Sequence, residues 1–288
     1  MLHCKTYAVL VGKILLGLMV LLAAVLIFWY TAAGKYTWTG VPVLNYHQVN
    51  DRFYTPITTT TANFEEQMKY LHDHGYHSIT QAQFQDYIEN EGPLPDKPVL
   101  ITFDDGYEDN YSQAWPILKK YDMTATIFLV TGYVSYYPLY LTWDEVKEMN
   151  GDHVEFGSHT VSHMPLIDME QQRVRSELTD SKKAIEARVG HTIDFLAYPE
   201  GKYNDMVEQE TKAAGYVAAF TVQVGRDHPT DDHYALNRVA IFEGGNYSFL
   251  HFRFRLIMST LCSYLWRSHA YVANTLGLSR IAAVIPQP

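Results

Sequence analysis

Two adjacent aspartates, Asp104 and Asp105, follow an apolar run in the stretch VLITFDDGYEDN, residues 99–110. Neighbouring carboxylates repel each other unless a positive charge stabilises one of them. A metal ion or a basic side chain could supply that charge. The alternative is an Asp-Asp-Gly turn that caps a helix, with both acids solvated. The pair is the first candidate for chemistry in this chain.

Two histidines, His159 and His163, lie four residues apart in GSHTVSH, residues 157–163. On a helical turn this spacing places both imidazoles on one face, where they can bind one ion. A carboxylate from another strand end would complete a set of two histidines and one carboxylate. Such a set leaves positions open for water and is typical of a catalytic metal site. The second aspartate would remain free to accept a proton.

The elements that must position these residues alternate between strands and helices from residue 41 to 242. Apolar runs such as 98–103, 124–130 and 154–158 precede amphipathic segments, and Thr80 is the expected cap of one helix. This order predicts an α/β fold with a parallel sheet, either open or closed as a barrel. The polar clusters fall at the carboxyl ends of the predicted strands, the edge that carries the chemistry of such barrels. These clusters are 46–47, 104–106, 158–159 and 199–201.

Charge and cysteine content exclude several classes of protein. Of the 22 basic residues, three lie in 1–40 and four in 249–288, so the middle of the chain holds 15, against all 32 acidic residues. An acidic middle would repel phosphates and argues against nucleic acid as a partner. The cysteines, Cys4 and Cys262, lie outside this middle section and cannot form a disulfide framework or a thiolate metal site.

The chain begins with an apolar segment. Residues 14–33 carry no charge and are about long enough to cross a bilayer, and Lys5 and Lys13 precede them. We expect a short cytoplasmic segment (1–13), a transmembrane signal-anchor (14–34), an extracytoplasmic catalytic domain (35–248) and a basic, aromatic tail (249–288). This makes a single-pass protein of the cell membrane. A cleaved signal peptide is the alternative for the anchor. The tail suits either a membrane interface or a helix packed on the domain.

Three motifs carry a resemblance to a known family. TFDDG (102–106), HTVSH (159–163) and YPEG (198–201) resemble the polysaccharide deacetylases of carbohydrate esterase family four, the NodB-homology domain. The resemblance spans about residues 41–242 and implies a distorted (β/α) barrel of about seven strands that hydrolyses acetyl groups. It implies that Asp104 is the catalytic base and that Asp105, His159 and His163 bind a divalent ion. Zinc is the expected metal, with Co²⁺, Ni²⁺ or Mn²⁺ as alternatives.

The third motif departs from the family pattern. Ala197 stands where most relatives have an arginine that orients the base, and Glu200 stands where they have tyrosine. Arg238 is a candidate replacement for that arginine. The turn, Tyr198, Pro199, Glu200 and Gly201, could bind substrate and supply a backbone N–H for the oxyanion. A plain strand-ending bend is the alternative. Trp143 is expected either to stack on a sugar at the rim or to start a helix in the core.

His47, in PVLNYHQV near the start of the domain, is the candidate general acid. The placement resembles the branch that deacetylates poly-N-acetylglucosamine in biofilms, where the motifs are circularly permuted and an N-terminal Tyr-His supplies the acid. Imidazole gains and loses protons near neutral pH and could protonate the departing amine. The alternative is a loop histidine without a chemical role.

Taken together, the residues predict a metal-dependent N-deacetylase of a cell-surface polysaccharide that contains N-acetylglucosamine. An O-deacetylase of peptidoglycan or another polysaccharide would use the same site. A glycan-binding protein that has lost catalysis is the alternative from a different class. Ala197 and Glu200 favour that alternative, whereas an intact base beside a metal site argues against it.

Overall fold

A computed structural model describes residues 40–242 and 248–270, together with Gly17 and Val20. The chain divides into two compact units, residues 1–39 and 40–288, and the fold below is that of the second. Apart from Gly17 and Val20, the predicted membrane segment 14–34 lies outside the described residues. Among the described helices, none is both long and apolar enough to span a bilayer.

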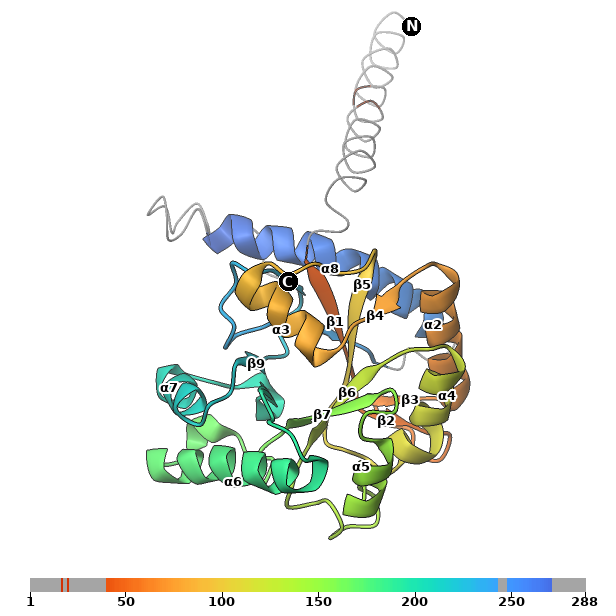
Figure 1. Cartoon of the computed structure of the whole chain (residues 1–288). Coiled ribbons are helices and arrows are strands. Elements are labelled where there is room, and N and C mark those ends of the chain that lie inside the picture. Colours follow the sequence, from red (N-terminus) through yellow and green to blue (C-terminus); the bar gives the residue numbers. More distant parts are fainter. Residues whose placement is uncertain (1–16, 18–19, 21–39, 243–247, 271–288) are drawn as a thin grey trace, which may run out of the picture. The chain divides into compact units, whose positions relative to one another are not determined.

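Most strands of this unit join one curled sheet, with the order β10-β1-β5-β6-β7-β8-β9 (Figure 1). Neighbours pair in parallel except β1 with β10, while β11 pairs with β1 and β4 with β5. The bounds are β1 Val41–Tyr46, β4 His77–Ser78, β5 Pro98–Phe103, β6 Ala125–Leu129, β7 Val154–Ser158, β8 Phe195–Ala197, β9 Ala218–Phe220, β10 Arg226–Asp227 and β11 Val239–Ala240. A separate pair joins β2 (Gln48–Val49) to β3 (Thr58–Thr59). This confirms the predicted α/β class, with a curled sheet that fits a distorted barrel of about seven strands.

Helices surround the sheet, most of them on its outer face, whereas the helix that contributes Phe84 and Ile88 packs on the inner side. They are α2 Thr61–Asp73, α3 Gln81–Asn90, α4 Trp115–Lys120, α5 Trp143–Met149, α6 Gln171–Val189, α7 Asp205–Ala213 and α8 Ser248–Ala270, with a short π-helix, η1, at Asn110–Ala114. The predicted cap is confirmed: Thr80 accepts from the backbone of Gln83, whose side chain accepts from the backbone of Thr80. The reciprocal bonds satisfy donors that a helix N-terminus otherwise leaves free.

The two faces of the sheet differ in what they bury. Leu44 and Tyr46 of β1 pack outward in the larger core cluster, whereas Val41 and Val43 pack inward in the smaller one. Because side chains alternate along a strand, Asn45 continues the inward row toward the end of β1. The polar groups of the site therefore lie above an apolar barrel interior.

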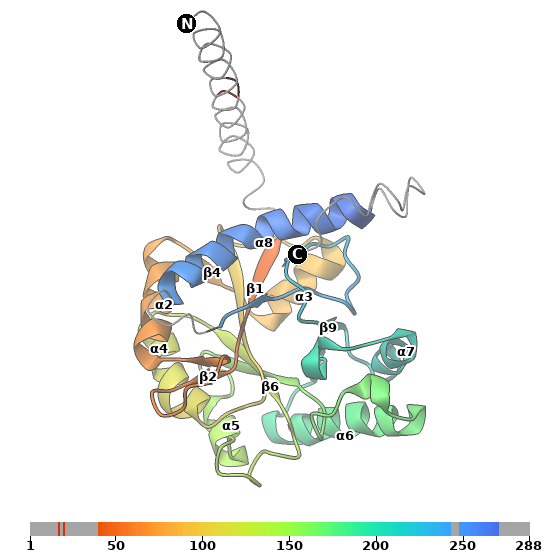
Figure 2. The same ribbon diagram turned by 180° about the vertical axis from the view of Figure 1, so that it is seen from behind.

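Figures 1 and 2 both show α8 across the end of the sheet at which β1 begins. Phe252 and Leu256 of α8 are each 1% exposed. Tyr70 of α2 packs edge-on against Phe252, with 6.0 Å between the ring centroids. The strands that carry the candidate catalytic residues end at the opposite edge.

Candidate active site

Asp104 is a buried carboxylate held by two donors. It follows β5 and is 3% exposed. Arg238 Nη1 donates to its Oδ1 over 2.6 Å, and Asn45 Nδ2 donates to its Oδ2 over 3.2 Å. Burial is the largest single influence and by itself would raise the pKa of Asp104, but the charges of Arg238, His159 and His47 and the hydrogen bond from Arg238 together outweigh it. The pKa of Asp104 therefore falls well below its ordinary value.

Asp105 points instead toward the two histidines. Its Oδ1 lies 3.2 Å from His163 Nε2 and 3.6 Å from His159 Nε2. This oxygen is buried and has no hydrogen-bond partner. One donor atom from each of the three residues lies within 4.8 Å of the others. One carboxylate and two imidazole nitrogens suit a divalent ion such as zinc, and an ion would satisfy the orphaned oxygen.

His159 has the tautomer that a metal ligand needs. Its Nδ1 lies 2.7 Å from the carbonyl oxygen of Ala197, an acceptor that requires Nδ1 to carry the proton. Burial lowers the pKa of His159, although Asp104 and Asp105 oppose the shift. The lone pair of Nε2 therefore faces Asp105, and a carbonyl fixes the ring as in many metal-binding histidines.

The predicted helical turn between the histidines is wrong. Residues 159–163 form a loop, and Thr160 and His163 have φ of 68° and 59°. This left-handed region is unfavourable for residues other than glycine, so neighbouring contacts must stabilise it. Glu177 of α6 supplies two of them, because its Oε2 accepts from the backbone N–H of Val161 at 2.9 Å and of Ser162 at 2.8 Å.

A similar backbone conformation places the aspartate pair. Asp105 and Gly106 have φ of 72° and 73°, so the chain turns sharply where β5 ends. A Cβ at position 106 would lie 2.7 Å from Leu129 Cδ2. Glycine therefore relieves both backbone strain and a close contact. The turn allows adjacent aspartates to face different partners.

His47 lies beside Asp104. Its Nε2 is 3.9 Å from Asp104 Oδ2, and its side chain is 19% exposed. The distance is too long for a hydrogen bond, but it places the imidazole of the proposed acid beside the carboxylate of the proposed base. The general-acid role stays a prediction.

The turn at 198–201 could contribute backbone N–H groups to the site, because the side chains of Tyr198 and Glu200 have partners elsewhere. The ring of Tyr198 belongs to the outer core cluster and stacks on Tyr203. The N–H groups of Tyr198 and Gly201 donate to the carbonyls of Phe220 and Tyr198, and Pro199 has no N–H. Glu200 therefore supplies the candidate N–H, and its own carboxylate pairs with Lys202. The oxyanion role stays a prediction.

Trp143 packs against the larger core cluster at the start of a helix, as the structural alternative predicted. It begins α5, with the guanidinium of Arg188 over its ring at 5.3 Å from the centroid. It lines a cavity of about 360 Å³ to which Asp104, Asp105, His159 and His163 do not contribute. Its predicted stacking on sugar stays a prediction.

The sequence reasoning missed three features. Asn45 donates to Asp104, and Glu177 clamps the histidine loop. The rings of Tyr107 and Tyr140 stack with their centroids 5.0 Å apart, and burial, followed by the nearby charge of Asp105, raises the pKa of both phenols. The sequence signal for the role of Asn45 was an amide inside an apolar strand, two residues before His47. The tyrosine-rich run at 133–140 was a signal for the third.

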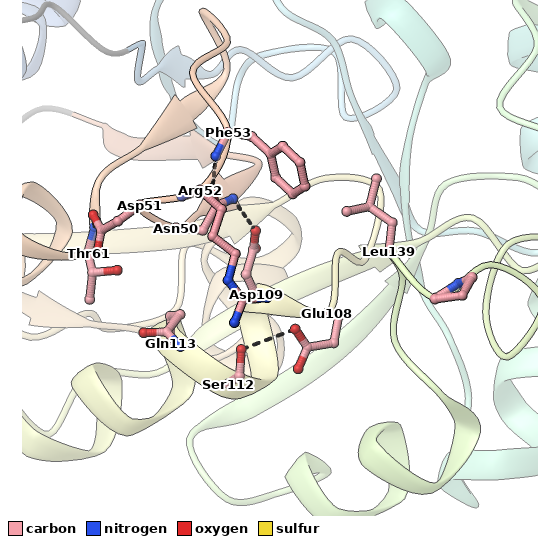
Figure 3. A pocket seen from close by; sticks show the side chains of 11 residues that line it. Asn50, Asp51, Arg52, Phe53, Thr61, Glu108, Asp109, Ser112, Gln113 and Leu139 are labelled. Atoms are coloured by element: carbon pink, nitrogen blue, oxygen red, sulfur yellow. Dashed lines mark hydrogen bonds between the residues drawn. The ribbon is translucent and has the colours of Figure 1, made fainter.

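A cavity of about 510 Å³ opens at the same rim (Figure 3). It is lined by Asn50, Asp51, Arg52, Phe53, Thr61, Glu108, Asp109, Ser112, Gln113, Pro138 and Leu139. Asp109 is 8% exposed and accepts from Asn50 Nδ2 at 2.6 Å. The next residue, Asn110, donates to the carbonyl of His47 at 2.9 Å. Hydrogen bonds therefore connect the wall of this cavity to the backbone at His47.

Comparisons with known proteins show the family to which the chain belongs. The family model for polysaccharide deacetylases matches residues 91–219. YxkH of Bacillus subtilis (strain 168), a protein assigned to the polysaccharide deacetylases, is 34% identical over 204 residues, which cover 71% of this chain and 72% of YxkH. The chain belongs to the polysaccharide deacetylase family. It is accordingly a hydrolase, and the deacetylases of this family are metal-dependent.

Other members of the polysaccharide deacetylase family are also similar. The poly-beta-1,6-N-acetyl-D-glucosamine N-deacetylase of Staphylococcus aureus (strain MSSA476) is 28% identical over 234 residues, covering 72% of this chain and 80% of that protein. The solved structure of the Streptococcus pyogenes deacetylase PplD in complex with acetate superimposes with a TM-score of 0.70 at 28% identity, covering 74% of this chain and 97% of PplD. IcaB from Ammonifex degensii, at 23% identity and a TM-score of 0.68, shares the fold over 76% of this chain and 97% of its own.

Proposed function

We propose that this polysaccharide deacetylase removes N-acetyl groups from a polymer that contains N-acetylglucosamine, with a divalent ion held by Asp105, His159 and His163. The observation that carries the proposal is the convergence of these three side chains beside a separate buried carboxylate, Asp104. The S. aureus relative named for N-deacetylation of poly-N-acetylglucosamine supports the choice of substrate.

The chain's own residues divide the remaining work. When bound, the ion would polarise the acetyl carbonyl and lower the pKa of the attacking water. Asp104, kept ionised and oriented by Arg238 and Asn45, accepts the proton of that water. The N–H of Glu200 stabilises the developing oxyanion. His47 donates a proton to the departing amine, so that cleavage of the C–N bond gives acetate and a free amine.

The rim provides room for more than one sugar. Glu108 lines both the large cavity and a second one of about 270 Å³, which Tyr136, Tyr137 and Tyr140 also line. Tyr136 is 74% exposed and Phe53 of the large cavity 49%. Aromatic rings beside polar groups suit sugars, which present apolar faces and hydroxyls. We place the units that flank the reacting sugar along these cavities.

We also propose that residues 14–34 anchor the enzyme in the cell membrane, with the catalytic domain outside the cytoplasm. This rests on the uncharged run at 14–33 and the two lysines before it. A polymer at the cell surface is within reach of a domain tethered in this way.

The test measures acetate release from N-acetylglucosamine oligomers by the full chain in detergent, after chelation and return of single metals. We expect activity only with a divalent ion, and with it stoichiometric binding by the wild type but not by His159→Ala. A protein that binds the ion yet releases acetate only from O-acetylated glycans would replace the proposed substrate. Absence of metal binding would refute the central assignment.

A further inference from the structure

Helix α8 is fixed to the domain by one face. Arg226 of β10, 4% exposed, donates from Nε to Ser259 Oγ at 3.0 Å and from Nη2 to the carbonyl of Leu256 at 3.2 Å. Arg255 of the helix donates to the carbonyl of Ala240 in β11 at 2.6 Å. Together with the buried Phe252, these bonds determine which side of α8 faces outward.

The outward side is an apolar stripe. Leu250 and Phe254 are each 59% exposed and Ile257 is 46% exposed. Their spacing of four and three residues places them in one row on a helix, opposite the buried Phe252, Leu256 and Ser259. Isolated exposed apolar residues are normal, but a continuous row on a helix marks a surface that binds something.

The charge around this row suits an anionic surface. The chain has no acidic residue from 244 to 288, whereas its middle section carries 32 acidic and 15 basic residues. Arg253 lies beside the stripe and is exposed, with its guanidinium over the ring of Tyr70 at 5.4 Å from the centroid. Two copies of α8 packed face to face would bring these arginines together with no acid on either helix to offset them. A lipid surface with anionic headgroups accepts both the apolar row and the arginine.

The position of α8 agrees with this partner. Arg226, which binds α8, pairs with Pro42 at the start of β1. Gly40, where the described domain begins, is six residues beyond the end of the predicted anchor at 34, and six residues span at most about 20 Å. The candidate active site lies at the other end of β1, whose six residues extend roughly 20 Å.

We propose that Leu250, Phe254 and Ile257 of α8 lie on the anionic membrane surface, so that the catalytic rim faces away from the bilayer. The inference rests on the proposed anchor at 14–34, which sets the domain beside a membrane. Two membrane contacts would limit rotation about the tether and present the rim to a polymer outside.

The test uses the full chain with Cys4→Ser and Cys262→Ala, reconstituted in vesicles of phosphatidylcholine and phosphatidylglycerol. Phe254→Cys is labelled with an environment-sensitive fluorophore, and quenching by lipids spin-labelled near the headgroup is measured. The matched control is a label at Asp144→Cys in α5, where the side chain is 98% exposed. We expect blue-shifted, strongly quenched emission at 254 and unshifted, unquenched emission at 144, and a weaker effect at 254 in pure phosphatidylcholine.

Each other outcome has a separate meaning. Protein that alkaline carbonate extracts from the vesicles refutes the anchor, and with it the inference. Protein that resists extraction but shows no quenching at 254 refutes the role of α8 alone. A blue shift without lipid quenching, lost on dilution into excess vesicles, assigns the stripe to a second copy and overturns the proposal. Deacetylation of soluble oligomers by Phe254→Glu should match wild type, which separates this test from that of the catalytic site.

Discussion

Two buried arginines, Arg238 and Arg226, lie at opposite ends of the barrel and have different partners. Arg238 is fully buried and donates to the carboxylate of Asp104. Arg226, 4% exposed, donates to a hydroxyl and a carbonyl of α8, and burial lowers its pKa to about 10. Arg226 begins β10 and Arg238 directly precedes β11, and both of these short strands pair with β1. The sequence around the two arginines therefore does not show that their roles differ.

The difference lies in what each guanidinium holds in place. A charge opposite a carboxylate controls the protonation of that carboxylate, and here the carboxylate is the proposed base. A guanidinium that faces uncharged acceptors holds them in position, and its hydrogen bonds must offset the free energy lost when the charge is removed from water. The comparison predicts that changes at the rim alter catalysis, whereas changes to the contacts of Arg226 alter stability and leave catalysis of soluble substrates unchanged.

The largest effect is expected for Asp104→Asn. Asparagine keeps the shape but cannot accept a proton, so kcat should fall by about 10³-fold, within the range for general-base catalysis. Acetate release from oligomers measures this, with metal content and thermal unfolding as controls for folding. Activity within tenfold of wild type would show that another group is the base.

Arg238→Gln should reduce activity and change its pH dependence. Arg238 is the largest influence that lowers the pKa of Asp104, so without it that pKa rises and the carboxylate is protonated at a higher pH. The acid limb of kcat/KM should therefore move to higher pH, and stability should fall by about 3 kcal/mol because a buried charge loses its partner. Arg238→Lys, which keeps the charge, should restore part of the profile. An unchanged acid limb in the glutamine variant would remove Arg238 from the catalytic side of the comparison.

Glu177→Gln should weaken metal binding by about 10- to 100-fold, as loss of a group that orients a ligand commonly does. Both N–H groups of the histidine loop donate to Oε2, and Arg173 donates to Oε1 at 2.6 Å, so the NH₂ group of the amide faces a donor whichever way it is turned, and the charge that strengthens these bonds is lost. Competition with a chelator measures the affinity. Glu210→Gln, a second buried acid that binds Arg175 instead, is the matched control and should leave the affinity unchanged.

Asn45→Ala should reduce kcat by about tenfold, which corresponds to one hydrogen bond to a charged group. The donor to Asp104 Oδ2 is lost, but Arg238 still holds Oδ1. Kinetics on oligomers would show the change in kcat with KM nearly constant. If Asn45→Ala lost more activity than Arg238→Gln, Asn45 rather than Arg238 would be the more important support of Asp104.

Ser259→Ala should have the smallest effect, limited to stability. It removes one acceptor from Arg226 and should cost about 1 kcal/mol, which lowers Tm by about 2–4 °C for a domain of this size. Deacetylation of soluble oligomers should be unchanged below the transition. A loss of activity in the folded variant would mean that the α8 end and the rim are coupled, and the comparison would fail.

The sequence by itself determined the class of fold and predicted most residues of the candidate site. Alternating apolar patterns are local, so they predicted most of the longer strands and helices, but not short strands such as β2, β3 and β10. The carboxyl ends of those strands carry His47, Asp104, Asp105 and His159, because parallel strands bring their ends to one edge. The family motifs predicted the metal ligands, and the structure places their donor atoms together.

Only the tertiary structure decided what supports these residues. Arg238 is 134 positions from Asp104, and Asn45 is 59 positions away, so their meeting depends on the strand order around β1. The prediction of a helical turn at the two histidines was wrong because a contact with a distant segment decides the backbone conformation there. Glu177, on a distant helix, binds the loop's N–H groups and stabilises a left-handed backbone that local propensity disfavours. Residue types are written in the chain, but which of them neutralise or orient each other depends on contacts between distant segments.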